Sequence, residues 1–295
     1  MTDTGHNLLA VESARVTYAG DVAAVKDASF TISPGEHVAI VGESGSGKTT
    51  LALAIAGLLT AGDAECSFSR FSFDGCPVSR GRVSPIPHRT PGMSMVFQNA
   101  MTSLDPVATV GAQFRDVLRG LSKLSRKEAR RRSLTWLASV GLRNPERVLK
   151  LRPYELSGGM RQRVMLALAM CGEPKLLIAD EPTSALDASV SRDVMDLIRS
   201  VTERSHTSLL MVTHDIDLCR MYVDKVIVMY KGEIVDICAA DRIEDEATHP
   251  YTRALTECVP TLASADLDRL PTLDHSALVP VHDREGSLLE GAVPA

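Results

Sequence analysis

The chain has 295 residues, 44% of them hydrophobic, which suits one large globular domain, or one domain with an insertion and a tail. Its formal net charge of −5 excludes the broad basic surface of a dedicated nucleic-acid-binding protein. We find no signal-peptide pattern, no apolar run near the ~18 residues that span a bilayer, and no cysteine spacing that indicates a metal site.

The first part of the chain predicts antiparallel β-structure. Residues 8–41 alternate apolar and polar positions around the break "SPGE", as expected for a hairpin that leads into a further strand. The stretch "SFSRFSFDG" at 67–75 predicts one edge strand.

A glycine-rich stretch, "GESGSGKTT" at 42–50, lies between a strand predicted over 36–42 and a helix predicted over 48–59. Glycines allow a tight turn whose N–H groups point at an anion, and the helix dipole adds positive potential there. The spacing fits G-x-x-x-x-G-K-[ST], in which the lysine reaches the β- and γ-phosphates and the hydroxyl binds Mg²⁺. We therefore expect a nucleotide site formed by Gly42, Ser44, Gly45, Ser46, Gly47, Lys48, Thr49 and Thr50.

Residues 102–170 change to helical periodicity. Amphipathic helices are predicted for "VGAQFRDVLRGL" at 110–121 and for "EARRRSLTWLASVGL" at 128–142. Ser125 and Glu128 form a capping box at the start of the second helix. The pattern predicts an inserted helical subdomain.

An α/β pattern then resumes. "KLLIAD" at 175–180 and "TSLLMVTH" at 207–214 predict buried strands of a parallel sheet, and "KVIVMYKGEIVDI" at 225–237 predicts a hairpin. The helix expected between the two buried strands has an apolar face made of Val190, Val194, Leu197, Ile198 and Val201. Beyond about residue 260 the chain is rich in proline and lacks periodicity, which predicts a loosely ordered tail.

Two strand ends carry candidate catalytic groups. Asp180 and Glu181 follow a buried strand, at the edge where open α/β sheets place their ligands. We expect Asp180 to hold Mg²⁺ and Glu181 to polarise the attacking water. His214 ends the next strand and is positioned to hydrogen-bond the γ-phosphate and orient Glu181 or the water.

The chain resembles ATP-binding cassette (ABC) ATPases over roughly residues 8–260, most specifically through "LSGGMRQR" at 156–163, which is similar to the family's signature motif. The resemblance implies an α/β fold: a P-loop NTPase (RecA-like) core with an antiparallel β subdomain and an inserted α-helical subdomain at about 100–170. These parts make an ATPase domain over 1–260, which the tail follows at 261–295. It also implies two head-to-tail subunits, in which Ser157, Gly158 and Gly159 contact the γ-phosphate that the partner subunit holds.

The resemblance implies further roles for individual residues. Tyr18 matches the aromatic residue that stacks on adenine, and Gln98 matches the glutamine that touches Mg²⁺ and water and senses the membrane partner. Ser184 to Asp187, "SALD", match the loop that crosses to the partner's phosphate site. The implied cofactors are ATP and Mg²⁺, and the implied reaction is ATP hydrolysis.

One branch of the family fits best. "FQNAMTSLDPV" at 97–107 and "HPYTRAL" at 249–255 resemble ATPases of importers for oligopeptides, dipeptides and nickel or metal chelates. Ala100 replaces their usual proline, and the tail lacks the cysteine-rich segment that many peptide-importer ATPases carry, so no iron–sulfur cluster is expected and the cargo stays open.

Such an ATPase would work as a peripheral subunit at the cytoplasmic face of the cell membrane. The resemblance implies an identical or homologous second ATPase, two transmembrane permease subunits and an extracytoplasmic substrate-binding protein. We expect the helical insert and the segment after Gln98 to form a groove for a cytoplasmic helix of the permease, with Met101 and Val110 among its apolar positions.

Two other classes of protein share parts of this pattern. A soluble ABC-type ATPase of DNA repair, chromosome structure or translation usually has long coiled coils, zinc modules or two cassettes, which this sequence lacks. An unrelated phosphate-loop kinase or GTPase would not explain the signature-like stretch or His214.

Overall fold

The computed structural model describes residues 7–59, 64–78, 90–97, 103–121, 124–184 and 187–258. Gln98, Ala100, Met101, the middle of the "SALD" stretch and the tail from 259 lie outside the described residues. The strands are β1 Leu9–Tyr18, β2 Val22–Ile32, β3 His37–Val41, β4 Ala64–Ser67, β5 Arg70–Phe73, β6 Cys76–Pro77, β7 Met93–Val96, β8 Leu176–Asp180, β9 Ser208–Thr213, β10 Lys225–Tyr230 and β11 Glu233–Ala239.

These strands form one sheet in the order β6-β5-β1-β2-β11-β10-β3-β9-β8-β7, with β4 also paired to β1. The first part is antiparallel, and β1 and β2 form the predicted hairpin. The strand predicted over 67–75 is confirmed as β5, which pairs with β1. It is not the outermost strand, because the short β6 pairs with it on its other side, and β4 is a separate strand that ends at Ser67. Ser13 interrupts β1 with a φ of 48°, so β4 pairs with the residues after it and β5 with those before it.

The second part of the sheet is parallel from β10 through β3, β9 and β8 to β7. The predicted hairpin β10–β11 joins this part to the first, because β11 pairs with both β10 and β2. β3, β8 and β9 are buried along their whole length. Their side chains alternate between two cores, as successive residues of a strand must. Val38 and Ile40 face α1 and the antiparallel strands, whereas Ala39 and Val41 belong to the core that contains the other helices.

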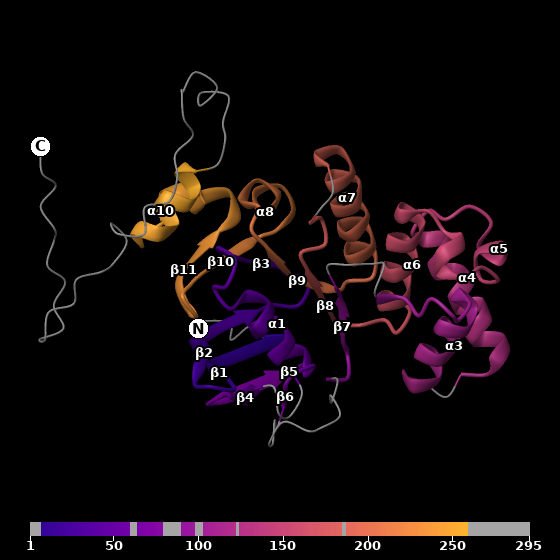
Figure 1. The fold of residues 1–295 in the computed structure, drawn as a ribbon, viewed down its shortest axis with the longest axis horizontal. Coiled ribbons are helices and arrows are strands. Elements are labelled where there is room, and N and C mark those ends of the chain that lie inside the picture. Colours follow the sequence, from indigo (N-terminus) through magenta and orange to yellow (C-terminus); the bar gives the residue numbers. More distant parts are fainter. Residues whose placement is uncertain are drawn as a thin grey trace, which may run out of the picture.

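The helices lie on both sides of this sheet and at one end of it (Figure 1). Their bounds are α1 Lys48–Ala56, α3 Val110–Leu121, α4 Arg126–Ser139, α5 Pro145–Val148, α6 Gly158–Met170, α7 Ala188–Arg204, α8 Ile216–Tyr222, α9 Ile243–Glu246 and α10 Pro250–Glu257, with short 3-10 turns at Pro153–Glu155 and Ala240–Arg242. Of these, α3 to α6 gather at one end, away from the antiparallel strands (Figure 1). No described helix is both long and apolar enough to span a bilayer.

The predicted helices are confirmed, with one difference in packing. α3 spans 110–121 as expected, and α4 begins at the predicted capping box of Ser125 and Glu128. On α7, however, Val190 is exposed, while Met195, which the predicted face omits, is buried. Val190 is exposed because it lies in the first turn of α7, before the part of the helix that packs into the core.

Candidate functional site

The phosphate loop connects the end of β3 to the first turn of α1, as the sequence predicts. Gly42, Gly45 and Gly47 have φ angles of 149°, 83° and 99°, which favour glycine. Space adds a second constraint. A Cβ on Gly42 would lie 2.2 Å from the carbonyl oxygen of Met229, and one on Gly47 would lie 2.3 Å from that of Ala24. The loop is therefore fitted against β2 and β10.

Lys48 folds back over this loop and is buried. Its ammonium donates to the carbonyl oxygens of Gly42 at 2.8 Å and Glu43 at 2.7 Å. Burial lowers the pKa of Lys48, an effect that the nearby carboxylates of Glu181 and Asp180 oppose. A longer contact of 3.5 Å joins the ammonium to the Ser46 hydroxyl. A buried ammonium held by neutral oxygens of the loop is well suited to turn to an anion that enters it.

Two oxygen-bearing side chains that suit a hard cation, those of Thr49 and Asp180, lie at the loop. The hydroxyl of Thr49 donates to Asp180 Oδ1 across 2.9 Å, joining the start of α1 to the end of β8. Burial raises the pKa of the Asp180 carboxyl, and the hydrogen bond from Thr49 partly offsets this. A hydroxyl and a carboxylate beside a phosphate loop fit the oxygen ligands that Mg²⁺ prefers. Tyr18 lies on the other side of the loop, with its hydroxyl 3.2 Å from that of Thr50.

The candidate catalytic pair lies where β8 and β9 end together. Glu181 Oε1 is 3.6 Å from His214 Nδ1, and 24% of the Glu181 side chain is exposed. Glu181 has a φ of 44°, an unfavourable conformation for a residue with a Cβ. Its backbone N–H donates to Val212 of β9 at 2.8 Å, and the turn behind it is closed by Ser184, whose hydroxyl donates to its carbonyl. The backbone is thus strained at the residue that carries the candidate catalytic carboxylate.

The signature-like stretch begins α6. Ser157 caps this helix by accepting the N–H of Met160, and a Cβ at Gly158 or Gly159 would meet no other atom of the described chain within 4 Å. This end of α6 is therefore open, as an anion-binding helix start requires. Gln162 further along α6 donates to the carbonyl of Pro182 at 3.1 Å, which ties the helix to the turn after Glu181.

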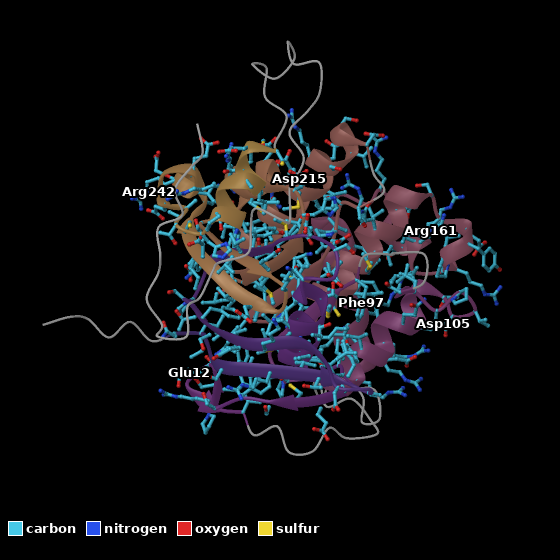
Figure 2. The ribbon with its side chains drawn as sticks, turned by 60° about the vertical axis from the view of Figure 1, so that its left-hand side comes forward. Glu12, Phe97, Asp105, Arg161, Asp215 and Arg242 are labelled. Carbon is cyan, nitrogen blue, oxygen red and sulfur yellow. The ribbon has the colours of Figure 1, made fainter. Side chains whose placement is uncertain are left out.

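The structure thus brings together most of the predicted nucleotide residues, from the loop at 42–50 to Asp180, Glu181 and His214. Asp187 lies beyond them as the N-cap of α7, where its side chain accepts the N–H of Val190. Phe97, the last described residue before Gln98, lies between the strands that carry Glu12 and the helices that carry Arg161 (Figure 2).

Sequence reasoning missed two contacts to the phosphate loop. Gly232, in the β10–β11 turn, donates its N–H to the carbonyl of Ser46 at 3.0 Å. Tyr251, in α10, accepts the N–H of Glu43 at 2.9 Å. Tyr251 is part of the motif "HPYTRAL", which indicates only a family. The motif itself does not indicate a contact with the phosphate loop.

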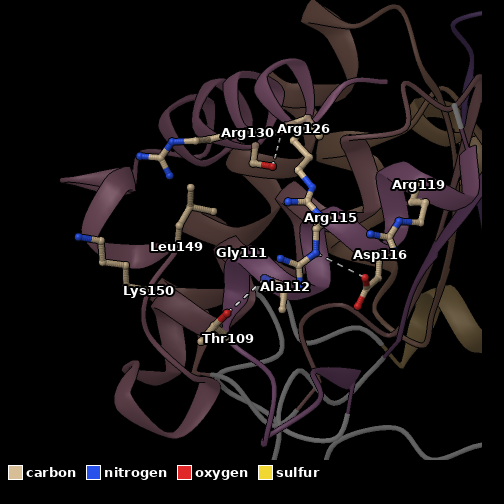
Figure 3. Close-up of a pocket in the computed structure, with 12 residues that line it drawn as sticks. Thr109, Gly111, Ala112, Arg115, Asp116, Arg119, Arg126, Arg130, Leu149 and Lys150 are labelled. Carbon is tan, nitrogen blue, oxygen red and sulfur yellow. Dashed lines mark hydrogen bonds and ion pairs between the residues drawn. The ribbon is translucent and has the colours of Figure 1, made fainter. Parts of the chain in front are cut away.

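A basic groove of about 710 Å³ lies in the helical part of the molecule. Its lining combines residues of α3, the first half of α4 and the segment after α5 (Figure 3). The charged residues of the lining are Arg115, Asp116, Arg119, Arg126, Arg130 and Lys150.

The cations of this groove are only weakly compensated. Arg115 and Arg126 point toward each other across it (Figure 3). The single acid of the lining, Asp116, lies 3.9 Å from Arg115, and Arg130 lies 3.5 Å from Glu146 outside it. Such a lining favours a partner that brings negative charge.

The expected interface position Val110 is wrong, because its side chain is 0% exposed. The first turn of α3 packs against the chain after α5, where the N–H groups of Val110 and Gly111 donate to the carbonyls of Leu151 and Leu149. Val110 therefore belongs to the core beneath the groove.

Comparison with known protein families and curated proteins gives consistent matches. The family described as "ABC transporter" matches residues 25–184. The oligopeptide transport ATP-binding protein AppD of Bacillus subtilis is 39% identical over 88% of this chain and 79% of its own length. The dipeptide transport ATP-binding protein DppD of the same organism is 40% identical over 83% and 74%. The glutathione import ATP-binding protein GsiA of Escherichia coli is 40% identical over 92% of this chain but only 46% of its own length.

Two solved structures have the same overall fold. One is cbiO1 from Clostridium perfringens, part of the ABC transporter complex cbiONQ, with a TM-score of 0.67, 29% identity, and coverage of 81% of this chain and 91% of that one. The other is a dimeric ATP-binding cassette in a post-hydrolysis state with ADP and Pi, with a TM-score of 0.61, 25% identity, and coverage of 79% and 98%.

Proposed function

Because this chain belongs to the ABC transporter family and is the ATP-hydrolysing subunit of an importer, we propose that its transporter takes up peptides. The observation that carries the proposal is the agreement among relatives at 39–40% identity, whose names specify oligopeptides, dipeptides and glutathione. Nickel and metal chelates, the other cargo that the sequence left open, are named by none of these relatives. The soluble ATPase without a permease is not favoured.

The site geometry supports a division of roles during hydrolysis. Lys48 and the N–H groups of the phosphate loop bind the phosphates, and Thr49 with Asp180 would hold Mg²⁺, which neutralises phosphate charge when bound. Glu181 accepts the proton of the attacking water, and His214 at 3.6 Å restrains the carboxylate that does so. Tyr18 contributes a ring for adenine, and Gln98 completes the set as the water and metal contact.

We assign the open end of α6 to a second ATPase subunit. The start of α6 presents the N–H groups of Ser157, Gly158 and Gly159 to an anion, but the phosphate loop of this chain precedes a different helix, α1. The anion would therefore come from a second chain. In a head-to-tail pair, each α6 would contact the γ-phosphate that its partner holds. Asp187, which is exposed at the start of α7, would contact the same partner.

The basic groove is our candidate for the permease-docking surface. Its residues come from α3, α4 and the segment after α5, which lie at the end of the molecule away from α1 and the phosphate loop (Figure 1). Its excess positive charge suits a cytoplasmic segment of the permease that carries carboxylates. Such docking would hold this chain at the cytoplasmic face of the membrane, in a system with two permease subunits and a substrate-binding protein.

The cargo can be tested with the complete transporter. The ATPase is reconstituted with its permease subunits in vesicles and supplied with the substrate-binding protein that copurifies with the complex. A tri- to pentapeptide, a dipeptide or glutathione should stimulate ATP hydrolysis and enter the vesicles. Stimulation by a nickel chelate with no response to any peptide would contradict the proposal.

A further inference from the structure

The C-terminal helix reaches the phosphate loop through one side chain. Tyr251 is 0% exposed, and its hydroxyl accepts the backbone N–H of Glu43 across 2.9 Å, although 208 positions separate the two residues. Figure 1 shows α10 beside β10 and β11, at the end of the molecule away from the helical insert.

The position of Tyr251 is well determined. Its ring stacks on Tyr230 at the end of β10, with ring centroids 4.2 Å apart. Burial raises the pKa of Tyr251 to about 12, so the hydroxyl is uncharged at physiological pH. A neutral, buried phenol is a rigid acceptor with only two side-chain torsions to fix.

A buried carboxylate anchors the start of α10. Asp236 in β11 accepts hydrogen bonds from the hydroxyls of Thr248 and Thr252 and from the N–H of His249. Burial alone would raise the pKa of Asp236, but these hydrogen bonds outweigh it and hold the pKa below its usual value. The start of α10 is thus anchored to β11 through Asp236, and the Tyr251 ring within α10 stacks on Tyr230 of β10.

Glu43 is held at both ends of its backbone. Its N–H donates to Tyr251, while its carbonyl accepts the ammonium of Lys48 at 2.7 Å. When Lys48 turns to a phosphate, that second contact is lost. The bond to Tyr251 does not involve any atom that ATP must displace, so it persists through binding.

We propose that Tyr251 is a positioning residue for ATP, whose hydroxyl keeps the phosphate loop in its binding conformation after Lys48 leaves the carbonyl of Glu43. The C-terminal segment thereby sets the affinity of the site without touching the nucleotide. The proposal depends on ATP binding alone and is independent of the cargo.

The test compares two matched substitutions in the full-length chain. Tyr251→Phe removes the acceptor and keeps the ring, whereas Tyr230→Phe removes a neighbouring buried hydroxyl that has no hydrogen-bond partner among the described residues. Tyr251→Phe should raise the Kd and KM for ATP by about three- to tenfold, the effect of one ordinary hydrogen bond, with kcat at saturating ATP within about twofold. Tyr230→Phe should leave all three unchanged.

A third variant, Asp236→Asn, loosens the start of α10 while Tyr251 and the loop stay chemically intact, and it should raise the Kd for ATP about two- to fivefold. It also keeps the test decisive if Tyr251→Phe does not fold. If Asp236→Asn, or a folded Tyr251→Phe protein, bound ATP with the Kd of the wild type, the proposal would be overturned. An equal rise in Tyr230→Phe would also overturn it, because the effect would then come from packing.

Discussion

The hydroxyl of Thr49 donates to the carboxylate of Asp180 across 2.9 Å, although 131 positions separate the two residues. The contact fixes the distance between the start of α1 and the end of β8, and so between the two oxygen ligands expected for Mg²⁺. Asp180 is only 7% exposed, and burial raises the pKa of its carboxyl. Ionising this carboxyl therefore costs more in the nucleotide-free chain than in the unfolded chain.

This relationship predicts that Asp180→Asn stabilises the chain and abolishes its activity. Because the folded pKa is raised, ionised Asp180 lowers the stability of the nucleotide-free protein at neutral pH, and this loss disappears as the pH falls through that pKa. The amide keeps an acceptor for Thr49 and carries no charge. We expect a melting temperature a few degrees higher in EDTA at pH 7 and a loss of Mg²⁺-dependent hydrolysis of at least about 100-fold.

The matched control for this change is Asp193→Asn, an exposed carboxylate on α7. Its stability should stay within about 0.5 kcal/mol of wild type. A lower melting temperature for Asp180→Asn than for this control would show that the Asp180 charge stabilises the empty site.

Lys48→Ala should weaken ATP binding by at least about tenfold, because the phosphates lose a charge-assisted hydrogen bond in a buried loop. The measurement is the Kd of Mg²⁺·ATP for the isolated chain. Lys26→Ala removes an exposed lysine paired with Glu233 at 3.1 Å and should leave that Kd unchanged. Equal affinities of the Lys48 and Lys26 variants would rule out the phosphate role of Lys48.

Glu181→Gln should bind ATP with near wild-type affinity and hydrolyse it about 10²- to 10⁴-fold more slowly, since an amide cannot accept the proton of the attacking water. Unhydrolysed ATP should then hold two chains together, which size-exclusion chromatography with and without ATP can detect. If turnover stayed at the wild-type rate, His214, 3.6 Å away, would become the better candidate for the base.

Much of the architecture could be predicted because it depends on local patterns, and the solved structures confirm the predicted α/β fold with its P-loop NTPase core. The capping box at Ser125 and the hairpin turn at Lys231 are encoded by neighbouring residues. Contacts between distant segments are not. Tyr251 reaches Glu43 because the β10–β11 hairpin brings α10 to the loop that follows β3, and periodicity in the sequence contains no information on that contact.

The incorrect assignment of Val110 has a related cause. A valine at the first position of an amphipathic helix suits an exposed apolar patch as well as a core, and the choice depends on the chain after α5 that covers it. The basic groove was missed for the opposite reason. Arg115, Arg126 and Lys150 come from three segments, and none of these segments looks like a binding motif by itself.

The groove leads to the last prediction, which concerns the permease. Reversing the charge of its two facing arginines, as Arg115→Glu with Arg126→Glu, should repel an acidic docking segment and reduce copurification of the permease by at least about tenfold. ATP binding by the isolated chain should be unchanged, because the phosphate loop lies in another part of the fold.

Arg143→Glu is the control, since Arg143 is exposed on the same helical part but does not line the groove. Intact copurification of the double variant would place docking elsewhere, whereas equal loss in Arg143→Glu would indicate a general charge effect. High salt should also reduce copurification of the permease with the wild-type chain, because exposed charge pairs weaken as the Debye length falls. Such a salt effect would support an electrostatic contact at the groove.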